Sequence, residues 1–310
     1  MSVAVVTDST AGLSAQTLAQ ADTRHIPLRI VGIPVLLGAL QRREGRDISS
    51  AQVTEALNSR KQPVTTSRLS PGELSALYRQ LLDQDGFDAV VSIHLASALS
   101  GTVEAARLAA AEFDGRVHVV DSRGVGMGLG YPVLEAVSAS EAGAAREDVA
   151  SAAERARQRV STYFYVDTLE YLRRGGRISA AAALVGTALS VKPILQVTAT
   201  GQIQVCGKVR TPLKGVKTLT SLAVTDAESQ ERLDVTVHHL GAAARAQTLA
   251  TELQHQLGSQ IANLQITEVG AAVGAHCGPG LVGVVVHRRP GELVDTQKIR
   301  IVRLLRGLGV

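Results

Sequence analysis

The sequence has few aromatic residues and few cysteines. Only 3% of its 310 residues are aromatic and none is Trp, so the ring surfaces on which single-stranded nucleic acids stack are scarce. Two cysteines, Cys206 and Cys277, are too few for a disulfide framework or a four-ligand zinc site. Nothing at the amino terminus resembles a secretory signal, because Asp8 interrupts the first apolar segment. We therefore expect a cytoplasmic protein without a metal site.

A strong charge imbalance and a long hydrophobic run are also missing. Lys and Arg number 32 against 28 Asp and Glu, a net charge of +4 without a long basic run. This balance disfavours nucleic-acid binding. The alternative of a DNA-associated regulator is supported by the slight positive excess alone, and it would predict salt-sensitive binding to duplex DNA. The longest strongly apolar stretch, Ile30 to Leu40, contains Pro34 and is shorter than the ~20 residues of a membrane helix. With 45% hydrophobic and 19% charged residues, the chain has the composition of an ordered globular protein.

Nucleotide-binding fingerprints are absent too. The stretch "GVGMGLG" has glycines at every second position, which misses the dinucleotide spacing, and "GKV" lacks the Ser or Thr of a phosphate-binding loop. We therefore expect no nucleotide cofactor.

The first half of the chain repeats one local pattern. A β-branched strand ends in a short loop rich in hydroxyls or glycine, and a helical pattern follows: "VAVV" runs into "TDSTAGL", "VVSIHL" into "ASALSGT", and "VHVV" into "DSRGVGMGLG". This pattern predicts a parallel, doubly wound sheet with helices on both faces. The clearest helix start is at "SPGEL", where Ser70 caps the helix, Pro71 begins it and Glu73 completes a capping box.

The pattern changes near residue 160, where we place a domain boundary between residues 1–159 and 160–310. The second half alternates short hairpins with longer crossovers, ending in the strand "LVGVVV". This mixture predicts a mixed α/β sheet domain. After about residue 288 a carboxy-terminal extension follows, whose "IRIVRLLRGLGV" has helical apolar spacing and could pack on the second domain.

Hydroxyl side chains recur at the predicted strand ends. Thr66, Ser67 and Ser100 precede or open predicted helices, where unpaired backbone N–H groups favour an anion. Each alone is typical of an ordinary N-cap, but loops at the carboxyl edge of one parallel sheet share a crevice, where together they would bind a carboxylate or phosphate. The other residues that we expect to line this pocket are Asp8, Ser9, Thr10, Ser97, Asp121 and Ser122.

Two further motifs carry candidate site residues. In "YLRRGGRIS", Arg177 either lies in a solvated turn or reaches a bound anion or an acidic partner. In "AHCGPG", side chains of consecutive extended residues would point to opposite faces, so His276 and Cys277 are not expected to form a nucleophilic dyad. His276 would either donate a hydrogen bond to an anionic head group or be an ordinary core histidine, while Cys277 packs as a small apolar residue.

A hydrolase is the alternative that these residues leave open. Ser100 would be its nucleophile and His276 its base, with Asp8 or Asp121 orienting the imidazole. The lack of a "GxSxG" turn at Ser100 disfavours this alternative.

The motifs, taken in order, resemble a known family. "VTDSTAGL", "TTSRLSPGEL", "SIHLASALSGT", "VVDSRGVGMGLGY", "YLRRGGRIS", "VKPIL", "KVRT" and "AHCGPG" follow the order seen in the DegV family of bacterial fatty-acid-binding proteins. The resemblance covers roughly residues 3 to 287. Cys277 stands where threonine is usual in the family, so the sulfur is not a family requirement.

The resemblance implies a two-domain α/β fold that holds one long-chain fatty acid, such as palmitate, in an apolar tunnel between the domains. By this resemblance Thr66, Ser100 and His276 bind its carboxylate, with Ser67 beside them. The resemblance also implies a separate, ATP-dependent fatty-acid kinase subunit, to which such a protein presents the lipid without being an enzyme itself. Arg177 and Arg210 are implied in phosphoryl transfer or in docking on that subunit. Lipid transport, with transient contact to a membrane surface, is the related role. No cofactor beyond the fatty-acid ligand is implied.

Overall fold

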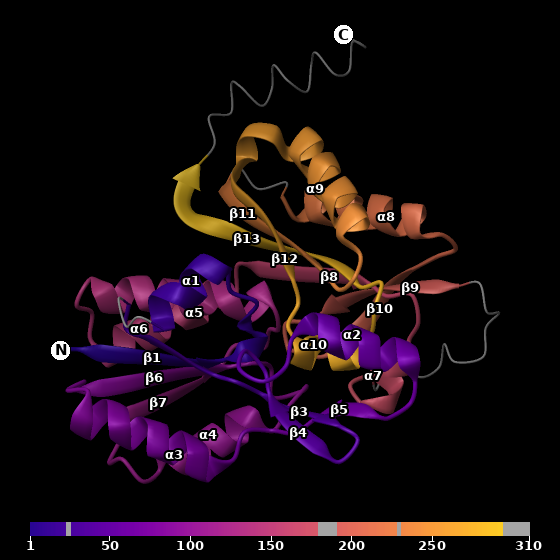
Figure 1. Cartoon of the computed structure of the whole chain (residues 1–310). Coiled ribbons are helices and arrows are strands. Elements are labelled where there is room, and N and C mark those ends of the chain that lie inside the picture. Colours follow the sequence, from indigo (N-terminus) through magenta and orange to yellow (C-terminus); the bar gives the residue numbers. More distant parts are fainter. Residues whose placement is uncertain (23–25, 179–190, 228–230, 294–310) are drawn as a thin grey trace.

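A four-stranded parallel sheet forms the first half of the molecule. The computed structural model describes residues 1–22, 26–178, 191–227 and 231–293 (Figure 1). The strand order is β2-β1-β6-β7, and every neighbouring pair is parallel. The strands are β1 (Val3–Asp8), β2 (Leu28–Val31), β6 (Ala89–His94) and β7 (Val117–Asp121). The prediction of a parallel sheet in this half is confirmed.

Helices cover both faces of this sheet, and this explains why β1 and β6 are buried along their whole length. Figure 1 shows α5 and α6 on one side of the sheet and α3 and α4 on the other. Alternate residues of β1 therefore enter different cores: Val5 packs with one cluster and Val6 with the other. The helices are α1 (Ala15–Asp22), α3 (Pro71–Arg79), α4 (Thr102–Ala110), α5 (Met127–Glu141) and α6 (Arg146–Arg157), with the short η1 (Ser9–Ala11) and η2 (Gln80–Gln84).

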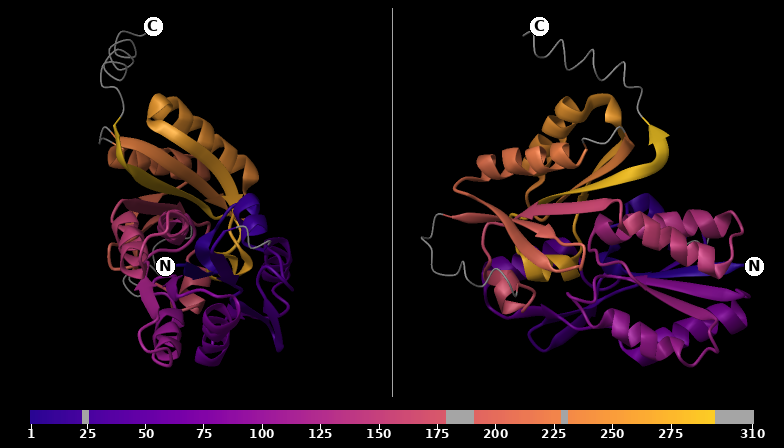
Figure 2. Two further views of the ribbon diagram at one scale, coloured as in Figure 1. Left: turned by 90° about the vertical axis from the view of Figure 1, so that its left-hand side faces the viewer. Right: turned by 180° about the vertical axis from the view of Figure 1, so that it is seen from behind.

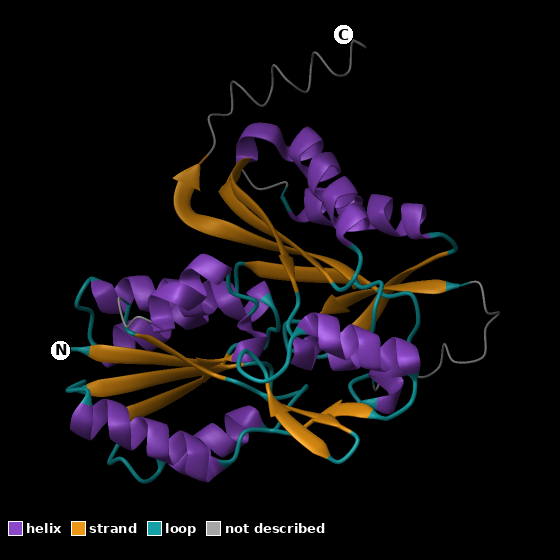
Figure 3. Cartoon of the chain, viewed as in Figure 1, coloured by secondary structure: helices purple, strands orange, loops and turns teal. Residues whose placement is uncertain are grey.

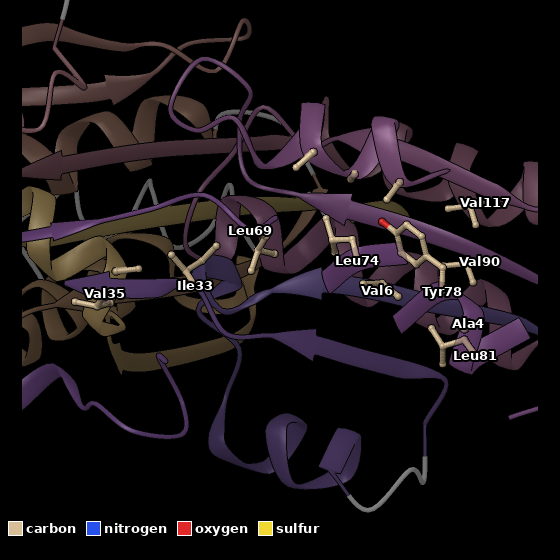
Figure 4. Close-up of a cluster of buried hydrophobic side chains, with 14 of the residues drawn as sticks. Ala4, Val6, Ile33, Val35, Leu69, Leu74, Tyr78, Leu81, Val90 and Val117 are labelled. Atoms are coloured by element: carbon tan, nitrogen blue, oxygen red, sulfur yellow. The ribbon is translucent and has the colours of Figure 1, made fainter. Parts of the chain in front are cut away.

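The capping box at the start of α3 is present as predicted. The Ser70 hydroxyl accepts from the backbone N–H of Glu73, and the Glu73 side chain accepts from the backbone N–H of Ser70. The helix then directs Leu74 and Tyr78 into the core, where Figure 4 shows them beside Val6 and Val90.

A six-stranded mixed sheet forms most of the second half. Its order is β10-β9-β8-β13-β11-β12, in which β11 and β12 are parallel and the other pairs antiparallel. Figure 3 shows both long helices on the outer side of this sheet. The elements are β8 (Val160–Tyr165), β9 (Lys192–Val197), β10 (Ile203–Val209), α8 (Pro212–Asp226), β11 (Glu231–His239), α9 (Ala243–Leu257), η4 (Gly258–Gln260), β12 (Ile261–Glu268) and β13 (Val282–Leu293).

The mixed sheet was predicted, and its first strand begins at Val160. The division into domains at this residue stays a prediction. Strand β13 continues past residue 288, where the sequence predicts an extension. The expected helical pattern of that extension falls on residues 294–310, outside the described part of the chain.

A small third sheet and three helices lie at the junction of the two halves. The sheet has the order β4-β3-β5, with β3 (Pro34–Leu37), β4 (Leu40–Arg43) and β5 (Val64–Thr66). The helices are α2 (Ser50–Ser59), α7 (Glu170–Arg174) and α10 (Ala271–Cys277). Although α10 comes late in the chain, it contacts α2, β3 and β5 from the first half, and Figure 2 shows this gold helix beside the indigo and purple elements.

Helix α10 differs from the sequence expectation. His276 and Cys277 were expected in an extended segment, whereas both belong to the last turn of this helix. The alanine-rich "AAVGAHC" favours a helix, and Gly278, with φ +75, ends it in a backbone conformation that suits glycine.

Candidate functional site

A mostly apolar cavity lies between the two halves of the chain. It encloses about 880 Å³ of space, including its open mouth. Its apolar wall draws on both halves, among others Ile33, Leu95, Leu99, Val125, Phe164, Leu172, Leu281 and Val284. Such a wall suits a ligand with a long apolar body.

The polar residues that line the same cavity include Thr66, Ser67, Ser100, Arg177 and His276. We call this set the polar cluster. The Thr66 hydroxyl lies 2.7 Å from Nε2 of His276, although the two residues are 210 positions apart. The strand β5 ends at Thr66, Ser100 precedes α4, Arg177 follows α7 and His276 is on α10. Four separate elements thus bring together all four residues that the sequence predicts as carboxylate ligands, with Arg177.

Arg177 is held in the cavity wall by backbone carbonyls. Its Nε donates to the carbonyl oxygen of Leu99 at 3.1 Å, and a terminal guanidinium nitrogen donates to that of Gly175. Burial lowers the pKa of Arg177, but a guanidinium keeps its charge in proteins. A fixed positive charge therefore stands beside the hydroxyls and His276.

His276 is uncharged at neutral pH. Burial, and then the positive charge of Arg177, lower its pKa from 6.5 to about 4. A neutral imidazole donates from one nitrogen and accepts at the other. The ring also explains one glycine of "RRGG": a Cβ on Gly175 would lie 2.3 Å from Nδ1 of His276. Only glycine at this position lets α7 approach the imidazole so closely.

Cys277 lines the cavity as a buried packing residue. Burial raises the pKa of its thiol to about 12, and the side chain packs in a cluster with Phe164 and Leu172. The sulfur is therefore a protonated packing group, in agreement with the sequence expectation. Within the described ranges, no three His, Cys, Asp or Glu residues are arranged to hold a metal ion.

The structure differs from the sequence for five of the six other residues expected to line the pocket. Thr10 is part of the cavity wall, whereas Asp8, Ser9, Ser97, Asp121 and Ser122 are not. Their polar groups instead form hydrogen bonds within their own loops or to neighbouring elements.

Particular hydrogen bonds account for three of these five residues. Asp8 accepts from Thr10 and from His94, at 3.0 Å, and the Ser97 hydroxyl donates to Asp121 at 2.6 Å. The expectation that strand ends share a crevice identified the right region but did not distinguish cavity-lining side chains from loop-binding ones.

Arg210 also lies outside the cavity. It lines a separate surface groove with Lys208, Lys214 and Lys217, where β10 ends and α8 begins. Arg177 and Arg210, which the family resemblance groups together, therefore stand in different surroundings.

His238 is a cavity residue that the sequence reasoning missed. It is buried; its Nε2 accepts from the backbone N–H of Met127 at 3.0 Å, and its Nδ1 lies 3.0 Å from the hydroxyl of Thr267. Burial lowers its pKa to about 4. The signal was a histidine pair at the end of the strand "DVTVHH", where an apolar residue would be ordinary in a buried strand.

Comparison with known proteins decides the family. The DegV family model matches residues 2–289. The chain belongs to the DegV family. It is 45% identical over 287 residues to a DegV domain-containing protein of Streptomyces coelicolor, covering 93% of this chain and 99% of the relative.

Two solved DegV structures have the same fold. A fatty-acid-binding DegV family protein from Thermus thermophilus matches with a TM-score of 0.85 and 32% identity, covering 93% of this chain and all of that one. DegV of Bacillus subtilis, a fatty-acid-binding protein, matches with a TM-score of 0.82 and 30% identity over the same shares. The family and the fold class predicted from the motifs are therefore confirmed. Among the described helices, none is long and apolar enough to cross a membrane.

Proposed function

We propose that this DegV family member binds one long-chain fatty acid, with the acyl tail in the apolar cavity and the carboxylate on the polar cluster. The observation that carries the proposal is the junction of the apolar wall with Thr66, Ser100, Arg177 and His276 in one cavity. The fatty-acid binding of the Thermus and Bacillus relatives supports it.

The apolar wall and the polar cluster contribute differently to the free energy of binding. Each buried methylene contributes about 0.8 kcal/mol before the costs of association, so the apolar wall supplies most of the affinity. A carboxylate removed from water needs compensating donors. Hydroxyls, a guanidinium and an imidazole supply charge-assisted hydrogen bonds and orient the head group.

In this proposal the protein has no catalytic role and acts in the cytoplasm. It presents the carboxylate to a separate ATP-dependent kinase subunit, which transfers the terminal phosphoryl group of ATP to a carboxylate oxygen and releases ADP; the same binding would serve lipid transport. Arg177 lies where the acyl phosphate would form, and the basic groove around Arg210 offers an acidic partner a docking surface. Loading would involve transient contact with a membrane surface.

The contacts of Ser100 and His276 do not match those that the hydrolase alternative requires. The Ser100 hydroxyl forms a hydrogen bond with Thr102, at 2.9 Å, and His276 forms one with Thr66. Asp8 pairs with His94 and Asp121 with Ser97. Neither carboxylate therefore orients the His276 imidazole.

A Ser-His-Asp arrangement does occur elsewhere, in the core. Ser92 lies 2.8 Å from Nε2 of His94, whose Nδ1 lies 3.0 Å from Asp8. All three side chains are fully buried, and Tyr78 donates to the Ser92 hydroxyl at 2.7 Å. Because a nucleophile must reach its substrate, this set is a structural hydrogen-bond network.

Native mass spectrometry of the purified protein tests the proposal, with fatty acid expected as a co-purified ligand. Calorimetry with palmitic acid and with hexadecanol then isolates the head group. Ser100→Ala should weaken palmitic acid binding by about 1–3 kcal/mol, the usual cost of leaving a buried partner unpaired, and should leave hexadecanol binding nearly unchanged. Ser97→Ala, at an exposed hydroxyl outside the cavity, is the matched control.

Three outcomes would contradict the assignment. One is absence of palmitic acid binding by the wild type, and a second is equal affinity for acid and alcohol. The third is turnover of a palmitoyl ester that disappears in Ser100→Ala, which would favour the hydrolase.

A further inference from the structure

Glu44 is a buried carboxyl group behind the cavity wall. It follows β4, is 6% exposed, and is not among the residues that line the cavity. Its Oε1 accepts from the backbone N–H of Ala272 at 3.0 Å, and its Oε2 accepts from the Ser9 hydroxyl. The Ser9 oxygen in turn accepts from the backbone N–H of Ile33 at 2.9 Å. Glu44 thus joins the amino end of α10 to loops 228 residues earlier in the chain.

The bond at Ala272 lies one helical turn before His276. Residues four apart share a face of a helix, and both residues line the cavity. Gly270 occupies the N-cap position of α10 and has no side chain to accept from the first N–H groups. A carboxyl group from the other half of the chain does so instead.

Two glycines make room for Glu44. A Cβ on Gly270 would lie 2.0 Å from Oε1 of Glu44, and a Cβ on Gly32 would lie 2.4 Å from its carbonyl oxygen. Glycine at these positions lets the carboxyl group reach the helix, and the surrounding burial holds it there.

We infer that Glu44 is a positioning residue: by holding the amino end of α10, it fixes His276 against Thr66 and thereby sets the affinity for a carboxylate that it does not touch. This inference rests on the proposed role of His276 in binding the fatty acid. It adds a residue that no cavity contact would identify.

Calorimetry with palmitic acid and hexadecanol separates positioning from general support. Glu44→Ala should weaken palmitic acid binding about tenfold or more, the scale of one lost charge-assisted hydrogen bond, and change hexadecanol binding less than about twofold. Glu44→Gln should restore acid binding, because an amide oxygen still accepts from the N–H of Ala272. The matched control is Glu268→Ala, which removes an exposed carboxylate that accepts from the backbone N–H of Gly241.

Gly270 provides a second perturbation that leaves Glu44 in place. The new methyl group of Gly270→Ala meets the carboxyl group, so acid binding should fall as in Glu44→Ala. In a Glu44→Ala background the same change has room and should cost nothing further. Likewise, Glu44→Ala added to His276→Ala should weaken acid binding no further, because Glu44 acts through His276.

The outcomes separate the two proposals. Absence of palmitic acid binding by the wild type would defeat the proposed function itself. If the wild type binds but Glu44→Ala keeps full affinity, or loses acid and alcohol equally, the positioning role is overturned. Glu44→Gln as weak as Gly270→Ala would also overturn it, and this pair carries the test if Glu44→Ala does not fold.

Discussion

Replacement of His276 by alanine tests the head-group site most sharply among single variants. The imidazole lies 2.7 Å from the Thr66 hydroxyl and next to the charge of Arg177, so its loss removes a donor and leaves Thr66 without this partner. A hydrogen bond to a charged group contributes about 1.5–3 kcal/mol, which corresponds to roughly a 10- to 150-fold rise in the Kd for palmitic acid.

Hexadecanol provides the internal reference for this variant. Removal of the ring also changes the apolar wall, but that change affects acid and alcohol alike. The ratio of the two Kd values from calorimetry at pH 7.5 therefore reports the head group alone. His118→Ala, an exposed histidine on β7, should leave the ratio unchanged. An unchanged ratio in His276→Ala would refute the reasoning.

Four further predictions follow from burial and capping. The pKa of His238 is about 4 when folded and 6.5 ordinarily, so roughly 3 kcal/mol of stability should be lost as pH falls through this window. Burial raises the pKa of Glu44 from 4.5 to about 7, so the contribution of this protonated carboxyl group to stability is lost as pH rises through that range. Glu44→Gln lacks this contribution, and in urea unfolding its stability should fall more steeply on acidification than that of the wild type. Parallel curves would contradict this expectation. A thiol reagent at pH 7.5 should modify exposed Cys206 and spare Cys277, and equal rates would show that the sulfur is accessible. Ser70→Ala should cost about 1 kcal/mol of unfolding free energy through the lost cap of α3, and a change below ~0.3 kcal/mol would show that the capping box contributes little.

The sequence predicts those parts of the fold that local signals determine. The parallel sheet follows from strands that run directly into loops and helices, and the start of α3 follows from Ser70, Pro71 and Glu73, whose interactions span only a few residues. Ser100 could be found because its loop follows β6 at the carboxyl edge of the parallel sheet, where ligands commonly bind. Thr66 was expected at the same edge, but it ends β5 of the small antiparallel sheet and reaches the cavity from there.

Long-range packing determines what the sequence could not predict. Helix α10 is only seven residues long, and its place beside β5 depends on contacts with the first half of the chain. In the sequence, Glu44 is an ordinary charged residue before a glycine. Its role could not be predicted because its hydrogen-bond partner, Ala272, is 228 residues away. Nothing in the sequence distinguishes Asp8 and Asp121 from residues that line the cavity. Only the structure shows that each accepts a hydrogen bond from the loop that follows it.

A crystal structure of the protein with bound palmitic acid tests the central claim most directly. The cavity also has polar side chains elsewhere in its wall, at Thr10, Thr162 and His238. The ligand could therefore bind in either of two opposite orientations. The account predicts carboxylate oxygens within hydrogen-bonding distance of Thr66, Ser100 and His276, with the tail among the apolar wall residues. A carboxylate bound at His238, with the tail directed toward Thr66, would contradict it.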